Sequence, residues 1–128
     1  GKSGLNLTKD ESPDLFRAAY GDAPPALRAA VAAFGPVAAM EWARGLGQEI
    51  FTGSTGRVFP VAWKASPLLR AWLSRLGDRG VGLRSRWRWT GFDGAASLFD
   101  TPDGPRRVEA VATILATGGA SWRRLGSD

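Results

Sequence analysis

The sequence predicts an α/β domain with short helices, one amphipathic helix packed on a sheet, and a three-stranded antiparallel meander. Three observations predict it: an apolar repeat at helical spacing over residues 66–77, a change to a repeat of two after Val81, and glycine and proline punctuation between segments. The chain has 128 residues, of which 44% are hydrophobic and 23% charged. That length and composition are typical of one globular domain.

A loop is predicted for the first eight residues, because Gly1, Gly4 and Asn6 fall within them. Successive backbone N–H groups in such a turn can form a concave site for an anion. The side chains of Asn6 and Thr8 add further donors.

Three short helices are expected next. The first begins at Ser12–Pro13, a capping residue followed by proline, and runs to about Gly21. The second begins after Asp22, and the third follows Gly35–Pro36 and ends before Gly45–Gly47.

A hairpin and the clearest helix follow. Glu49–Thr52 and Arg57–Pro60 are the expected strands, with Gly53–Gly56 as the turn between them. Ser66–Pro67 opens the helix and Gly77 ends it. Its apolar face is expected to be buried, with Trp72 in the core: Leu68, Leu69, Trp72, Leu73 and Leu76.

From Val81 the pattern indicates strands. Over residues 83–89, leucine and tryptophan fall on one face and arginine on the other. Two further strands are expected around Ser97–Phe99 and Arg107–Glu109, after turns at Gly91–Gly94 and Thr101–Pro105.

The last apolar run, Val111–Ala116, is apolar at consecutive positions. Such a run predicts a strand buried on both faces, as in the centre of a parallel sheet. It ends in Thr117–Gly119, where a crevice at the carboxyl ends of the strands would lie.

Composition excludes several classes of chemistry. Cysteine and histidine are absent, which excludes disulfides, thiolate or imidazole metal sites, cysteine nucleophiles and a Ser-His-Asp triad. No apolar run approaches the length of a membrane span, so no membrane partner is expected. The net charge of +5 predicts a modest attraction for anionic ligands.

In their order along the chain, five motifs resemble the bacterial FAD flavoproteins of the BaiN/RdsA type, also called aminoacetone-oxidase-like. The similar segments are residues 1–8, 56–60, 64–69, 88–91 and 116–122 with 126–127. The branch described as uncharacterised flavoproteins is the most similar. Two positions depart from the family pattern: Ser3 stands where glycine is common, and Arg123 replaces a proline.

The resemblance implies that residues 1–128 are part of a Rossmann-like FAD-binding domain. A βαβ unit with the dinucleotide glycine fingerprint would precede them and a second domain would follow, consistent with a start at Gly1 without methionine. It implies an FAD-dependent oxidoreductase of the cytoplasm that acts on a small-molecule substrate, with NAD(P)H as a candidate reductant, and that is inactive as this segment alone. The substrate, the electron donor and acceptor, the catalytic residues and the oligomeric state stay open.

The resemblance also assigns roles to residues. The Gly4–Thr8 loop would lie against the pyrophosphate and ribityl part of FAD, Val81–Arg84 would face the adenine, and Arg57 with Phe59–Pro60 would lie near the flavin. The glycines near the end would let the backbone approach the cofactor. The full predicted cofactor-binding set is Gly1, Ser3, Gly4, Asn6, Leu7, Thr8, Arg57, Gly82, Leu83, Thr117, Gly118 and Gly119.

The sequence also has features of two other functional classes. The arginines and tryptophans of residues 83–89 are the ingredients of a single-strand nucleic-acid platform. Their alternation puts rings and cations on opposite faces, so no nucleic-acid partner is expected.

Gly1–Ser3 is similar to the end of a phosphate-binding Walker loop, which must be followed by a helix. Residues 5–13 are a poor start for a helix, so an NTPase is not expected.

Overall fold

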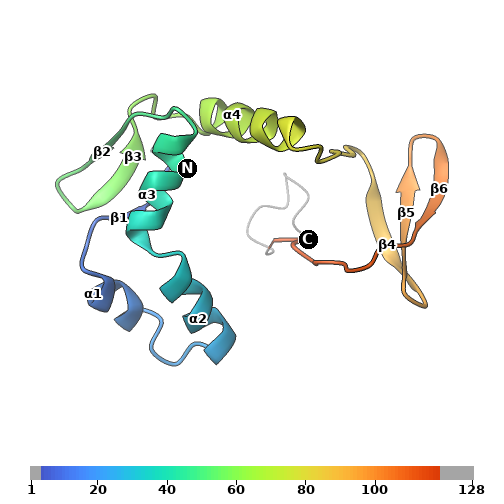
Figure 1. Ribbon diagram of the computed structural model, residues 1–128, viewed down its shortest axis with the longest axis horizontal. Coiled ribbons are helices and arrows are strands. Elements are labelled where there is room, and N and C mark those ends of the chain that lie inside the picture. Colours follow the sequence, from blue (N-terminus) through green and yellow to red (C-terminus); the bar gives the residue numbers. More distant parts are fainter. Residues whose placement is uncertain (1–3, 119–128) are drawn as a thin grey trace. The chain divides into compact units, whose positions relative to one another are not determined.

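The computed structural model describes residues 4–118, and the chain divides into two compact units, Gly1–Gly82 and Leu83–Asp128 (Figure 1). None of the helices in the described part is both long and apolar enough to cross a bilayer.

The three expected short helices are confirmed. They are α1 (Pro13–Ala18), α2 (Pro25–Ala33) and α3 (Pro36–Gly45), and each has proline at its start (Figure 1). Proline is favoured there because the first N–H groups of a helix have no partner within it. At α1 the Ser12 hydroxyl accepts a hydrogen bond from the Leu15 N–H at 3.3 Å.

The expected hairpin is also confirmed, and a third strand joins it. The antiparallel sheet has the order β1 (Thr8–Lys9), β3 (Arg57–Pro60), β2 (Ile50–Thr52). Thr8 and Thr52 both lie opposite Val58, whose side chain is fully buried. The strand at Thr8 corrects the prediction of a loop over all eight first residues.

The core of this unit joins α3 to α4 (Ala65–Asp78). Ala43 and Leu46 pack with Leu68, and the surrounding apolar residues include Leu5 and Leu7 from the N-terminal segment and Ile50 from β2. The amphipathic helix therefore packs on α3, at a core that Ile50 of β2 also reaches.

The prediction that the whole apolar face of α4 is buried was wrong. Leu68 is 6% exposed, whereas Leu69 is 49% and Trp72 43% exposed. Of the residues of this helix, Leu68 belongs to the buried cluster and Ala71 packs against it. Trp72 makes an edge contact with Trp42, with ring centroids 5.7 Å apart.

The second unit contains the expected meander, β4 (Arg88–Asp93), β5 (Ala96–Thr101) and β6 (Gly104–Val108) (Figure 1). The turn predicted at Gly91 is corrected: Gly91 lies inside β4, at a bulge that shifts the register after Trp89. A bulge accommodates the extra residue without ending the strand. The turn follows at Gly94, whose φ of +59° suits glycine.

The strand expected from Val81 begins only at Arg88, and the strand expected over Val111–Ala116 does not form. Residues 81–87 and 111–118 have no strand structure, and Val81, Leu83, Val111, Ile114 and Leu115 are exposed. An apolar run becomes a strand only when a neighbouring strand satisfies its N–H and C=O groups. Neither run pairs with a strand in the described part of the chain.

Candidate functional site

A hollow of about 490 Å³ lies between the N-terminal loop and the start of α4. It is lined by Gly4, Leu5, Asn6, Trp63, Lys64, Ala65 and Ser66. All of these residues belong to the first unit, and two of them, Gly4 and Asn6, are predicted cofactor-binding residues.

Backbone hydrogen bonds fix the loop along β3 and its continuation. The Leu5 N–H donates to the Trp63 carbonyl oxygen at 3.3 Å, and the Leu7 N–H donates to the Val58 carbonyl oxygen at 2.9 Å. Beyond β1, the Asp10 N–H donates to the Gly56 carbonyl oxygen at 2.7 Å. The loop is therefore held at both ends of its Leu5–Asp10 stretch by residues distant in sequence.

Gly4 is required by a close approach to Trp63. A Cβ atom built on Gly4 would lie 2.3 Å from Cε3 of the Trp63 ring and 3.0 Å from the Trp63 carbonyl oxygen. Contacts this short are far inside van der Waals range, so any other residue would force the loop and the ring apart.

Trp63 itself has an unusual backbone and a well-packed ring. Its φ is +57°, in the left-handed region that large side chains rarely adopt. The ring stacks on Phe59 with centroids 5.2 Å apart and a 24° interplanar angle, and it lies 5.2 Å from the Phe51 ring. The residue is still 51% exposed.

The charges around the hollow favour an anion. Lys64 is the N-cap of α4, no side chain among the described residues caps that helix, and its first turn has no acidic residue. Free N–H groups and the helix dipole give such a terminus a partial positive charge. The lining contains a lysine and no carboxylate.

The other predicted residues are placed as follows. Leu7 and Thr8 continue the loop into β1, where Thr8 pairs with Val58. Arg57 is exposed on β3 opposite Lys9, outside the hollow lining. Gly82 and Leu83 are exposed coil where the two units meet in sequence.

The predicted C-terminal residues belong to the second unit. Gly118 has a φ of +76°, a backbone conformation that favours glycine, and Thr117 precedes it in exposed coil. Gly1, Ser3 and Gly119 lie outside the described residues, as does Arg123.

The predicted set missed five lining residues: Leu5, Trp63, Lys64, Ala65 and Ser66. A signal was available for two of them, because Lys64 and Ser66 stand where the clearest helix of the sequence begins. Trp63 carried no comparable signal, since its contact with Gly4 joins residues far apart in the chain.

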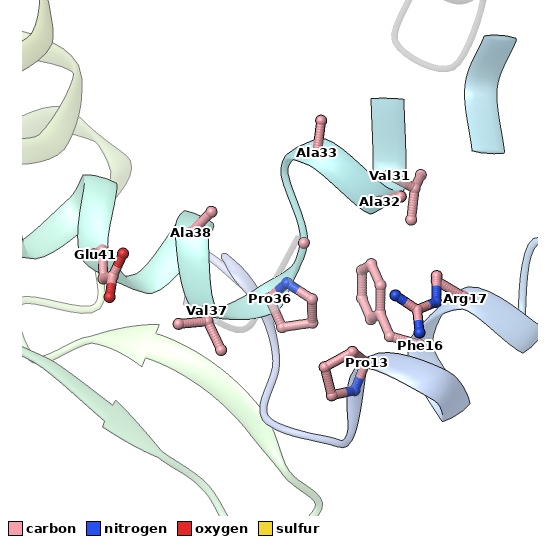
Figure 2. A pocket seen from close by; sticks show the side chains of 11 residues that line it. Pro13, Phe16, Arg17, Val31, Ala32, Ala33, Pro36, Val37, Ala38 and Glu41 are labelled. Carbon is pink, nitrogen blue, oxygen red and sulfur yellow. The ribbon is translucent and has the colours of Figure 1, made fainter. Parts of the chain in front are cut away.

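A second hollow, of about 280 Å³, lies among α1, α2 and α3, and contains none of the predicted residues. Figure 2 shows Phe16, Pro13 and Pro36 gathered there, with Arg17 beside them. Arg17 forms an ion pair with Asp14 at 2.5 Å. The lining is mostly apolar and offers no constellation for chemistry.

Two arginines of the second unit, Arg88 in β4 and Arg107 in β6, are paired with carboxylates. Arg88 pairs with Asp100 at 2.7 Å, and Arg107 pairs with Asp93 at 2.9 Å. Hydrogen bonds to Glu109 and Asp93 raise the pKa of the Arg107 guanidinium above its ordinary value. These cations already have carboxylate partners. Residues 4–118 contain no acidic cluster suited to a metal ion.

Comparison with known proteins identifies the family of the chain. The family model described as HI0933-like protein Rossmann domain matches residues 1–128. A search of the curated proteins finds no match.

Proposed function

Because this chain belongs to the HI0933-like proteins, whose Rossmann-domain model spans residues 1–128, we propose that it forms part of the FAD site of an oxidoreductase. Rossmann domains bind dinucleotides where glycine-bearing loops and helix N-termini meet the pyrophosphate. The proposal deepens this family assignment by naming the cofactor and the residues that hold it.

The hollow beside α4 is the observation that carries the proposal. It combines a loop that only glycine can start, an uncapped helix N-terminus and one lysine, with no opposing carboxylate in its lining. A pyrophosphate needs this set of N–H donors and positive charge. The residues present therefore fit the phosphate part of a dinucleotide, and the volume of about 490 Å³ suits part of such a ligand.

Individual residues have defined tasks in this proposal. The Gly4–Thr8 loop and Lys64 hold the phosphates, and Asn6 donates through its side chain. Gly82 and Leu83 contact the adenine, and Thr117, Gly118 and Gly119 let the backbone approach the cofactor. When bound, FAD supplies hydride or electron transfer, while the protein binds and orients it.

Arg57 is proposed to act near the flavin by electrostatics. It is exposed, and a guanidinium there favours an anionic reduced ring or an anionic substrate. Arg57→Ala in the complete protein should make the flavin potential more negative or weaken substrate binding. An unchanged potential together with unchanged kinetics would count against this role.

The finer parts of the proposal rest on the sequence resemblance. They are a BaiN/RdsA-type activity in a bacterial cytoplasm, NAD(P)H as the reductant and a small-molecule substrate. The resemblance also supports treating residues 1–128 as one part of a larger FAD domain.

Titration of the complete apoprotein with FAD tests the site. Lys64→Ala should weaken FAD binding about tenfold, because a charge-assisted hydrogen bond to phosphate is lost. Arg70→Ala is the matched control, since Arg70 is an exposed cation on the same helix outside the hollow. Equal weakening by both variants would show a general charge effect and contradict a site at Lys64.

A further inference from the structure

We propose that Trp63 is the aromatic wall of this site and stacks on a planar ring of the bound dinucleotide. The inference rests on the proposed FAD site and adds to it a residue that provides ring recognition. Three features of Trp63 carry it: its place in the hollow, its strained backbone, and its partly exposed ring.

The backbone of Trp63 is held in an unfavourable conformation by contacts on both sides. Its N–H donates to the Pro60 carbonyl oxygen at 2.9 Å, and its carbonyl oxygen accepts from the Leu5 N–H at 3.3 Å. A bulky residue with φ of +57° is a genuine outlier, and such outliers concentrate at ligand sites, where the surrounding structure over-determines them.

The ring of Trp63 is supported and still accessible. Phe59 stacks against it, and Phe51 packs beside both rings. The residue is 51% exposed and lines the hollow, so it is accessible to a ligand bound there. A rigid, pre-positioned ring loses little conformational freedom when it binds a ligand.

The neighbours of Trp63 match the chemistry of a nucleotide. Lys64, the next residue, is the N-cap of α4 and supplies positive charge, while Gly4 keeps the loop against the indole. In a nucleotide, one sugar unit separates the planar heteroaromatic ring from the phosphates. Phosphate binding at Lys64 therefore brings such a ring to Trp63, where offset stacking is favourable.

The test measures binding of FAD to the complete apoprotein and its variants. Trp63→Asn removes the ring but tolerates the left-handed backbone, and Trp63→Phe keeps an aromatic ring. Trp72→Gln is the control, because Trp72 is a similarly exposed tryptophan on α4 outside the hollow. Far-ultraviolet circular dichroism and the unfolding midpoint check folding, and Trp63→Gly replaces Trp63→Asn if the latter is unfolded.

We expect Trp63→Asn to raise the dissociation constant for FAD about tenfold, with Trp63→Phe within about threefold of wild type and Trp72→Gln unchanged. FMN and ADP identify the ring: a loss of FMN affinity assigns the isoalloxazine, and a loss of ADP affinity assigns the adenine. If Trp63 stacks on the isoalloxazine, the fluorescence of the bound flavin should also rise in Trp63→Asn, because a stacked indole quenches flavin fluorescence.

Failure of the two proposals can be distinguished. Wild-type protein that binds no FAD would overturn the proposed function, and the role of Trp63 with it. Wild-type protein that binds FAD, beside a folded Trp63→Asn variant with the same dissociation constant, would overturn the Trp63 proposal alone.

Discussion

Gly4 and Trp63 form the contact on which the site depends. The absence of a side chain at Gly4 lets the loop lie against the indole, and the Leu5 hydrogen bond to the Trp63 carbonyl oxygen follows from that approach. Two residues separated by most of the first unit thereby define one wall of the hollow.

Gly4→Ala should disrupt this contact. Its Cβ atom would lie 2.3 Å from the ring, so we expect a loss of about 1–3 kcal/mol in the free energy of unfolding and weaker FAD binding. Urea denaturation and FAD titration measure the two effects.

Gly77→Ala is the matched control for this substitution. Gly77 lies in α4 with nothing within 4 Å of a built Cβ atom, so alanine should be neutral or should stabilise by up to about 1 kcal/mol. Equal unfolding curves for the two variants would contradict the close approach at Gly4.

Two of the predicted cofactor-binding residues, Gly4 and Asn6, line the hollow, and their role in binding stays a prediction. Gly4 and Asn6 were found from the sequence because a glycine-bearing turn has its own backbone chemistry. Trp63 was not found, since its role depends on a contact across about sixty residues and on a φ that nothing in the local sequence indicates.

At the level of elements, α4 shows how far a periodic pattern can be trusted. The repeat of leucine and tryptophan correctly predicts the helix, because spacing alone determines which residues share a face. Burial of that face depends on what packs against it, and only Leu68 and Ala71 join the core.

Paired substitutions on α4 test this assignment. Leu68→Ala should lower the free energy of unfolding by about 2–5 kcal/mol, because it leaves a cavity beside Ala43 and Leu46. Leu69→Ala, at a 49% exposed position, should change it by less than about 0.5 kcal/mol. Comparable losses for both variants, measured by urea denaturation of the complete protein, would show that the Leu69 side of the helix is buried too.

Strands were predicted less reliably than helices, for a physical reason. The starts of α1, α2 and α3 follow from proline and capping chemistry within a few residues. By contrast, β1 exists because Thr8 meets Val58, and Val111–Ala116 is coil because no strand in the described part pairs with it. A strand depends on its neighbours, which a local pattern does not contain.

On the scale of the whole molecule, the net charge favours a polyanionic partner, whereas the ion pairs of individual arginines do not. The net charge of +5 attracts polyanions weakly, but Arg88 and Arg107 are already paired with carboxylates. At the start of β4 the tryptophan rings and the arginine have different neighbours. The Trp87 ring contacts the Phe99 ring, and Trp89 lies opposite Phe99 in the sheet, whereas Arg88 pairs with Asp100.

Binding to single-stranded DNA should therefore be weak and non-specific. We expect a dissociation constant in the range of about 1–100 µM at physiological salt, weakening steeply as salt rises. A filter-binding assay with a salt titration measures it. Submicromolar binding that persists at high salt and is lost in Trp89→Ala would instead support a nucleic-acid platform.

The visible absorption spectrum of the complete protein tests the FAD proposal most directly. We expect a yellow protein that keeps its flavin band through gel filtration, or a colourless apoprotein that acquires the band when FAD is added. A folded protein that stays colourless with excess FAD would contradict the account.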